Sequence, residues 1–224
     1  VYGGYASNDN QQGSLTLYGL LSESVDAMVY GHYVTRDDFK DGDGNKTFGS
    51  EGDVYNILGK LGYEFGDIHR IEISYDMYRD SGDYNPRPDM SGGANNGLSN
   101  NLLIPTDYDR DTVTLSYELR GDQHQGDVTL YNTETEIVRD ESVMAPRWPA
   151  NRLSKNTAKN QNFGLSAKFQ SLLTLGDFDH RATYGLDYMD KTSESYYGSS
   201  KFMDESAVST CLLYTSDAAD DYIR

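Results

Sequence analysis

Apolar and polar residues alternate along successive stretches of this chain, and this alternation restricts its fold more than any other feature. Between positions 55 and 65, Asn56, Lys60 and Glu64 take one parity, and the other parity carries Tyr55, Ile57, Gly59, Leu61, Tyr63 and Phe65. The run from Ile71 to Met77 repeats the pattern after the short connection 66–68. Because successive strand side chains point to opposite faces, each stretch is predicted to be a β-strand with one face for an apolar phase and one for water.

The connections between these stretches alternate in length. We expect short connections at 22–24, 66–68, 121–125 and 175–178. We expect long polar connections, rich in Gly, Pro, Asn and Asp, at 37–52, 80–107, 139–160 and from 191. Strands with tight turns at one end and long loops at the other are typical of a bacterial outer-membrane barrel. A soluble β-sandwich gives no reason for this segregation of loop lengths.

Composition is compatible with a barrel and excludes other classes. The chain has 224 residues, 37% apolar content and a net charge of -17. Its mean hydropathy of -0.70 is low, but half of each barrel strand faces a wet lumen. No apolar run reaches the length of a transmembrane helix, and the acidic balance argues against nucleic acid as a partner. The 19 Tyr residues suit either a membrane-interface girdle or ordinary strands.

The two ends of the chain carry separate expectations. Residues 1–10 lack a basic region followed by an apolar stretch, so no signal peptide is predicted. The segment from Cys211 to Asp220 resembles the translation of a transposon-end sequencing adapter. We therefore expect two parts, a partial barrel at 1–210 and a non-native tail at 211–224. The single cysteine, Cys211, belongs to that tail, so it indicates no thiol chemistry.

Several segments are similar to the first barrel hairpins of TonB-dependent outer-membrane receptors, closest to those for haem or ferric siderophores. The segments that carry this resemblance are GSLTLYGLLSESVDAMVYGHYVTRDDFKDGDG (13–44), NILGKLGYEFGDIHRIEISYDMYRDSGDY (56–84), YDRDTVTLSYE (108–118), FGLSAKFQ (163–170) and FDHRATYGLDY (178–188). The resemblance implies a barrel of about 22 strands that encloses a plug domain. It further implies active uptake of an iron complex, powered through TonB, which contacts the missing N-terminal region.

On this interpretation the chain holds about nine or ten strands of the larger barrel. An open, curved antiparallel sheet is expected, with two unpaired edges and with the tail after Thr210 unpacked. The expected surroundings are outer-membrane lipid and lipopolysaccharide. Two rivals remain open at this point. One is a passive outer-membrane porin, and the other is a soluble β-sandwich binding module.

Catalytic, metal and cofactor sites are not expected. The sequence Asp41-Gly42-Asp43-Gly44-Asn45 opens like a calcium loop, but Gly52 stands where the pattern needs Glu. A solvated acidic loop is therefore the better interpretation. The four histidines are dispersed, and three of them, His69, His124 and His180, lie in or beside short turns.

Ligand contact is instead expected in the long loops. These loops carry Tyr84, Arg87, Arg147 and Trp148. Arginine and aromatic side chains can hold an anionic, partly aromatic ligand such as a ferric chelate or a haem propionate. The alternative for these four residues is ordinary loop packing and lipopolysaccharide contact.

Overall fold

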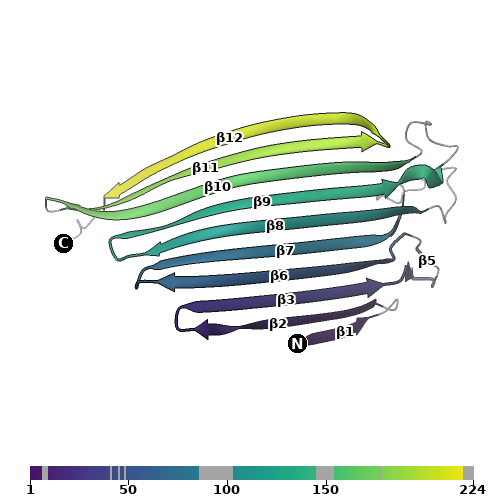
Figure 1. Cartoon of the computed structure of the whole chain (residues 1–224), viewed down its shortest axis with the longest axis horizontal. Helices are drawn as coiled ribbons and strands as arrows, with labels where there is room; N and C mark the ends of the chain where they lie inside the picture. The colour runs from purple at the N-terminus through teal and green to yellow at the C-terminus, as the bar shows by residue number, and fades with distance from the viewer. Residues whose placement is uncertain are drawn as a thin grey trace.

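The chain forms one large antiparallel sheet. The computed structural model describes residues 1–6, 10–40, 42–44, 46–47, 49–85, 103–144, 154–176 and 178–218. Ten strands pair in chain order, each with its sequence neighbours (Figure 1). Within the described ranges, no helix is both long and apolar enough to cross a membrane. The predicted fold class, an open all-β antiparallel sheet, is confirmed.

Most of the strands are long, and the longest, β10, has 21 residues. The sheet contains β1 (Tyr2–Ala6), β2 (Asn10–Ser22), β3 (Val25–Arg36), β6 (Gly52–Phe65), β7 (His69–Tyr84), β8 (Ile104–Arg120), β9 (His124–Asp140), β10 (Lys155–Leu175), β11 (Phe178–Tyr197) and β12 (Ser200–Ala218). A small separate hairpin joins β4 (Phe39–Lys40) to β5 (Lys46–Thr47), and the 3-10 helix η1 (Glu141–Met144) follows β9. A bilayer needs strands of only about 9–11 residues. The 14 to 21 residues of β6 to β12 therefore extend beyond it.

Tight turns join the strands at one end of the sheet, and the long connections lie at the other (Figure 1). Gly66 and Gly176 open two of the tight turns with φ of 59° and 67°, a conformation that glycine adopts at little cost. We call this end the short-turn end and the opposite end the long-loop end. The predicted alternation of short and long connections is thus confirmed for β2 to β11.

The expected long loop from 191 is wrong. Strand β11 continues to Tyr197, and β12 begins at Ser200 after Gly198, whose φ is 59°. This region is at the long-loop end, where both faces of the strands lie above the apolar band. Water on both faces removes the alternation by which a strand is recognised in a sequence.

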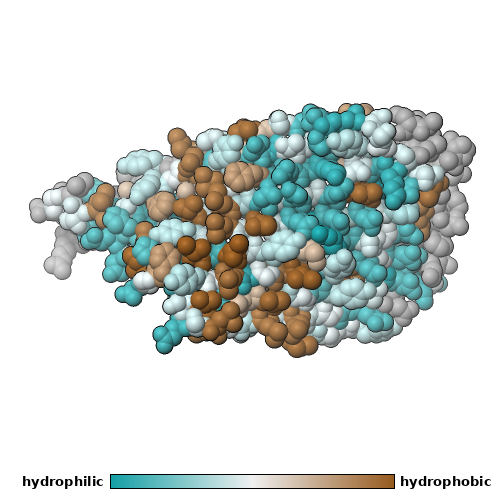
Figure 2. All heavy atoms as spheres, in the orientation of Figure 1, coloured by the Kyte–Doolittle hydropathy of each residue, from teal (hydrophilic) through white to brown (hydrophobic). Residues whose placement is uncertain are grey.

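One face of the sheet carries an apolar band. We call it the outer face and define it by the parity of Leu61, Ile73 and Leu115, which are 47%, 49% and 44% exposed. These side chains form a row that crosses the sheet by direct strand pairing: Ala27, Leu61, Ile73, Leu115, Leu130, Leu165 and Tyr188. Figure 2 shows the apolar residues gathered across the strands, with hydrophilic residues between them and the long-loop end. The band matches the lipid-facing surface of a barrel.

The opposite parity forms the inner face, which is polar. Lys60 and Glu72 lie on it, and so do Arg70 and Glu118. A sandwich would bury the apolar parity against a second sheet, but the described chain has only three buried hydrophobic residues, Val54, Ile104 and Ala182. The single layer with its exposed apolar band rules out the β-sandwich alternative.

The segment after Thr210 does not lie apart from the sheet, so the expectation of an unpacked tail is wrong. Residues 211–218 continue β12 and pair with β11 from Asp187 to His180. Leu212 and Tyr214 nevertheless remain 79% and 73% exposed. An edge strand is added through backbone hydrogen bonds, which almost any sequence can supply. This pairing therefore leaves the division between 1–210 and 211–224 a proposal.

Candidate functional site

Tyrosine and arginine side chains gather on the inner face toward the long-loop end. This Tyr/Arg cluster consists of Arg36, Tyr78, Tyr84, Tyr108 and Arg110. Strand pairing brings its members together, because Tyr78 is opposite Arg110 and the neighbouring Asp80 is opposite Tyr108. The cluster therefore spans β3, β7 and β8, three strands that are far apart in the sequence.

Arg36 is held by three neighbours. Its Nη2 donates to the Tyr84 hydroxyl at 3.1 Å, and its Nε donates to the Ser50 carbonyl at 3.0 Å. Asp80 lies 3.9 Å from the same Nη2 and also accepts a hydrogen bond from Tyr84. The guanidinium is thus fixed in direction, with its side chain 21% exposed. A fixed, partly exposed guanidinium can bind an anionic group with little loss of conformational entropy.

Arg110 supplies a second fixed guanidinium to the cluster. Its Nη2 donates to Asp76 at 3.1 Å, and Asn56 donates to the other oxygen of Asp76, also at 3.1 Å. The guanidinium carbon lies 5.4 Å from the centroid of the Tyr78 ring. Tyr78 in turn meets Tyr108 edge-on, with ring centroids 5.8 Å apart. Cation–π and edge-to-face contacts therefore arrange aromatic rings next to the charge.

The environment of Tyr84 favours its neutral form. Burial is the main cause, and the carboxylate of Asp80 adds to it, so that the pKa of Tyr84 is raised to about 12. The phenol consequently keeps its proton at neutral pH and donates a hydrogen bond to Asp80. This leaves the phenolic oxygen free to accept a hydrogen bond from Arg36.

Of the four residues expected to contact the ligand, the structure describes only Tyr84. Tyr84 is the last residue of β7 and belongs to the Tyr/Arg cluster. Arg87, Arg147 and Trp148 lie outside the described residues. The cluster members Arg36 and Arg110 were missed in the sequence, because a polar residue in a strand indicates only a solvated face. The signal that points to them is their shared inner-face parity with Tyr84.

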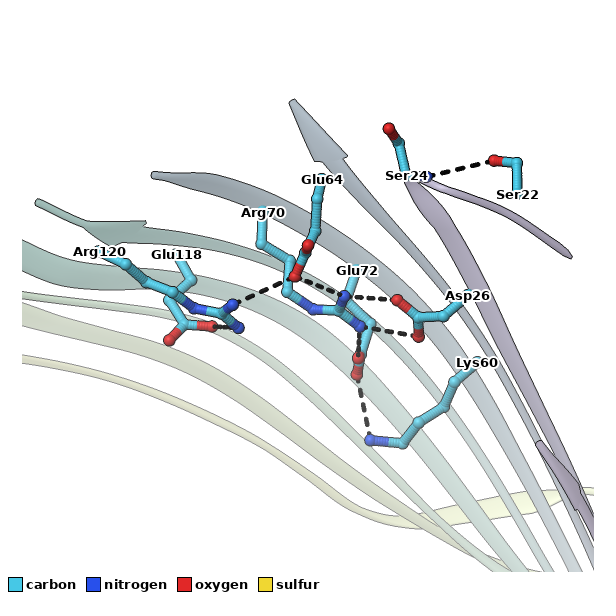
Figure 3. A network of polar contacts seen from close by, with 9 residues as sticks. All are labelled: Ser22, Ser24, Asp26, Lys60, Glu64, Arg70, Glu72, Glu118 and Arg120. Carbon is cyan, nitrogen blue, oxygen red and sulfur yellow. Dashed lines mark hydrogen bonds and ion pairs between the residues drawn. The ribbon is translucent and has the colours of Figure 1, made fainter. Parts of the chain in front are cut away.

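A second network of charges lies on the inner face near the short-turn end (Figure 3). Arg70 is at its centre and binds both oxygens of Asp26, at 2.5 and 3.0 Å. Its Nη2 also donates to Glu72 at 3.0 Å, and Lys60 binds Glu72 from the other side at 3.1 Å. In Figure 3, these side chains point toward one another from β3, β6 and β7.

The network continues to β8 through a shared carboxylate. Glu64 lies 3.6 Å from Arg70 and 3.1 Å from Arg120, whose other nitrogen binds Glu118 at 2.8 Å. Four carboxylates and three cations therefore nearly neutralise one another. Gly62 makes room for the centre of this network, because a Cβ there would collide with the Arg70 guanidinium and lie 2.6 Å from Asp26. The arrangement stiffens the inner face and provides polar groups for whatever fills the lumen.

Neither a metal-ligating cluster nor the acidic cavity beside Asp111 and Glu134 provides a site on the inner face. No group of three or more His, Cys, Asp or Glu that could hold a metal ion occurs among the described residues. Asp41 and Asn45 of the calcium-like sequence lie outside those residues. A shallow cavity of about 360 Å³ is on the outer face above the apolar band, and its lining includes Asp111, Glu134 and Lys159. It faces away from the lumen.

The fold is that of an arc of an outer-membrane transporter barrel. The structure aligns with the FrpB iron transporter of Neisseria meningitidis (F5-1 variant) at a TM-score of 0.71 and 19% identity, over 86% of this chain and 30% of that one. It also aligns with the ferric enterobactin receptor PfeA of Pseudomonas aeruginosa at a TM-score of 0.64 and 16% identity. That alignment covers 93% of this chain and 34% of the receptor.

Sequence comparison points to the same class. The chain is 29% identical to the heme transporter BhuA of Brucella ovis over 191 residues, which are 84% of this chain. It spans 26% of the length of that relative. No protein-family model matches. The predicted resemblance to TonB-dependent receptors and the predicted outer-membrane location are confirmed, and the relatives are named as transporters and receptors.

Proposed function

We propose that the chain is part of the barrel wall of a receptor that imports an iron complex, either haem or a ferric siderophore, across the bacterial outer membrane. The observation that carries this proposal is the similarity to a haem transporter along 84% of the chain. The fold agrees, since the neighbours named above transport iron or bind a ferric siderophore. The role is in transport, and we assign no catalytic residue.

The Tyr/Arg cluster is the proposed ligand contact of this segment. It lies on the inner face toward the long-loop end, which is the extracellular end in outer-membrane barrels. Two fixed guanidinium groups, Arg36 and Arg110, and the aromatic rings of Tyr78 and Tyr108 suit a ligand that is both anionic and aromatic. Arg87, Arg147 and Trp148 extend this proposal to the long loops on the same side.

The proposed partners follow from the two faces and two ends of the sheet. The outer-face apolar band would contact lipid, and the charged outer face above it would meet lipopolysaccharide. The network around Arg70 faces the part of the lumen where the family resemblance places the plug. TonB would act through an N-terminal region beyond this segment.

Energy dependence tests the proposal against a passive porin. The complete receptor gene that contains this segment is deleted from its host, and uptake of radiolabelled haemin and of a ferric catecholate is measured with and without complementation. We expect complementation to restore uptake of one of the two complexes, and a protonophore to abolish it. Uptake that persists when the proton gradient is collapsed would favour the porin, because passive diffusion needs no coupling.

A further inference from the structure

Three of the four histidines lie on the outer face at the short-turn end. His69, His124 and His180 all have the parity of the apolar band, as their pairing with Leu119, Ser171 and Leu173 indicates. They come from alternate strands, β7, β9 and β11. The sequence places each beside a short turn, but only the strand register puts all three on one face.

Their positions follow the tilt of the strands. Each next histidine lies two residues closer to the short-turn end for every two strands crossed. With about 4.8 Å between strands and about 3.4 Å per residue, this stagger corresponds to a tilt of about 35°. Strands of outer-membrane barrels tilt by about 35–45°. The three imidazoles therefore lie at about the same depth in the membrane.

The apolar band supports this tilt direction independently. Its edge toward the long-loop end descends in the same sense, from Tyr55 in β6 to Met77 in β7, Val113 in β8 and Leu130 in β9. Across β6 to β9 this edge therefore descends in the same sense as the histidine row, which lies along the opposite boundary of the band, but about twice as steeply, by two residues per strand crossed.

Two of the imidazoles are fixed by hydroxyl groups. His69 Nδ1 lies 2.8 Å from the Tyr117 hydroxyl, and the His69 ring stacks between Phe65 and Tyr117, with centroids 5.1 and 6.0 Å away. His124 Nδ1 lies 2.9 Å from the Ser171 hydroxyl, which is 3.2 Å from the Tyr184 hydroxyl. When the hydroxyl donates to Nδ1, the proton of the imidazole resides on Nε2, which is then a hydrogen-bond donor.

Charge is otherwise missing from this boundary. From the Leu61 row to the short turns, the described outer-face residues of β6 to β11 include no Asp, Glu, Lys or Arg. The imidazoles are thus the only side chains there that can carry a positive charge. Aromatic neighbours such as Phe65, Tyr117 and Tyr184 are typical of the interface between acyl chains and headgroups.

We propose that this histidine row binds the phosphate groups of phospholipids in the periplasmic leaflet of the outer membrane. The imidazole Nε2–H groups donate to the anionic phosphate oxygens, while the acyl chains pack on the adjacent apolar band. A phospholipid satisfies both surfaces at once, whereas free phosphate would use only the polar one. The assignment of the histidine row to the periplasmic leaflet rests on the proposed function, because the short-turn end is periplasmic only if the chain is part of an outer-membrane barrel.

The test compares histidines on the two faces. The complete receptor carrying H69F, H124F and H180F keeps the aromatic rings but loses the nitrogen atoms. The matched control is H32F, since His32 lies on the inner face of β3 and stacks with Tyr30. Each protein is titrated with phosphatidylglycerol in nonionic detergent, and bound lipid is counted by native mass spectrometry.

We expect the triple variant to bind phosphatidylglycerol at least roughly tenfold more weakly, as for loss of a hydrogen bond to a charged group. The H32F control should bind as the wild type does, and inorganic phosphate should not displace the lipid. Equal binding by the triple variant, equal weakening by H32F or displacement by inorganic phosphate would each overturn the proposal. If the triple variant does not fold, the single variant H124F must show a weaker affinity than H32F.

The lipid titration contains no iron complex, so it can contradict the lipid-binding proposal without bearing on the proposed import of an iron complex, and the uptake assay can do the reverse. A receptor for another cargo would give the same lipid result. A histidine row without lipid affinity would leave iron uptake unchanged.

Discussion

Arg36 and Tyr84 are 48 residues apart in the sequence, yet the guanidinium of one donates to the hydroxyl of the other at 3.1 Å. The contact reaches from β3 to β7 across the intervening strand β6, on the inner face. Asp80 completes the group by accepting from Tyr84. The long-loop end of the wall is thereby held by side chains as well as by backbone pairing.

Removing the Tyr84 hydroxyl should loosen Arg36. In the complete receptor, Tyr84→Phe is expected to lower the free energy of unfolding by about 0.5–1.5 kcal/mol. It should also weaken binding of an anionic iron complex, because Arg36 is then free to turn toward Asp80. Ligand titration and urea unfolding measure the two effects. Tyr33→Phe is the control, since it removes a hydroxyl that binds Asp53 on the outer face, and its ligand affinity should not change.

The stability contribution of Tyr84 should depend on alkaline pH. Its pKa is about 12 in the folded chain, above the ordinary tyrosine value of about 10. The stabilisation is therefore complete below about pH 10. It is lost as the pH rises through about 12. The difference in phenolate absorbance between wild type and Tyr84→Phe follows this ionisation, and a transition near the ordinary pKa would contradict the partly buried, hydrogen-bonded phenol.

A side chain at position 62 should be destabilising, because it displaces the Arg70 guanidinium from its ion pairs. A methyl group there collides with Arg70 and approaches Asp26 to 2.6 Å, so Gly62→Ala should cost about 1–3 kcal/mol. Gly59, on the same strand but on the outer face, has nothing within 4 Å of its Cβ position. Gly59→Ala should therefore change stability by about 0.5 kcal/mol or less. Urea unfolding in lipid vesicles compares the two, and equal costs would mean that Arg70 moves aside freely.

The sequence predicts the sheet well where lipid and lumen act on opposite faces. Ile57, Leu61, Ile71 and Ile73 have one parity because only that face meets the apolar phase. Beyond the band both faces are in water, and the pattern fades. This is why the sequence predicts loops at Lys155–Asn160 and Lys191–Tyr197, although the structure places both segments in strands, β10 and β11.

The candidate site could be predicted only in part. Tyr84 is recognisable as an aromatic residue near a long loop. Arg36 and Arg110 are not recognisable, because their role in the Tyr/Arg cluster depends on the strand register, which brings residues on β3, β7 and β8 together. A single sequence indicates the parity of a strand, but the distance between strands depends on pairing. The histidine row is likewise visible only once that register is known.

The tail should be distinguishable in genomic DNA. Since backbone pairing alone explains how residues 211–218 extend β12, their origin is a separate question. We expect the genomic sequence to match the chain up to Thr210 and to diverge from Cys211 onward. Amplification of the locus from source DNA with primers placed outside it checks this. Codons for CLLYTSDAAD in the genome would show that the tail is native.

The assignment of the two faces leads to opposite outcomes for neighbouring residues on β8. Leu115 is opposite Ile73 within the apolar band, whereas Thr114 is opposite Ser74 on the inner face. Leu115→Arg places a charge in the lipid and should destabilise the complete receptor by about 2–4 kcal/mol. Thr114→Arg should cost less than about 1 kcal/mol, because its side chain enters the polar lumen. Urea unfolding from lipid vesicles measures both variants. If Thr114→Arg were the more costly of the two, the outer and inner faces would have to be exchanged, and the Tyr/Arg cluster would then face the membrane surroundings instead of the lumen.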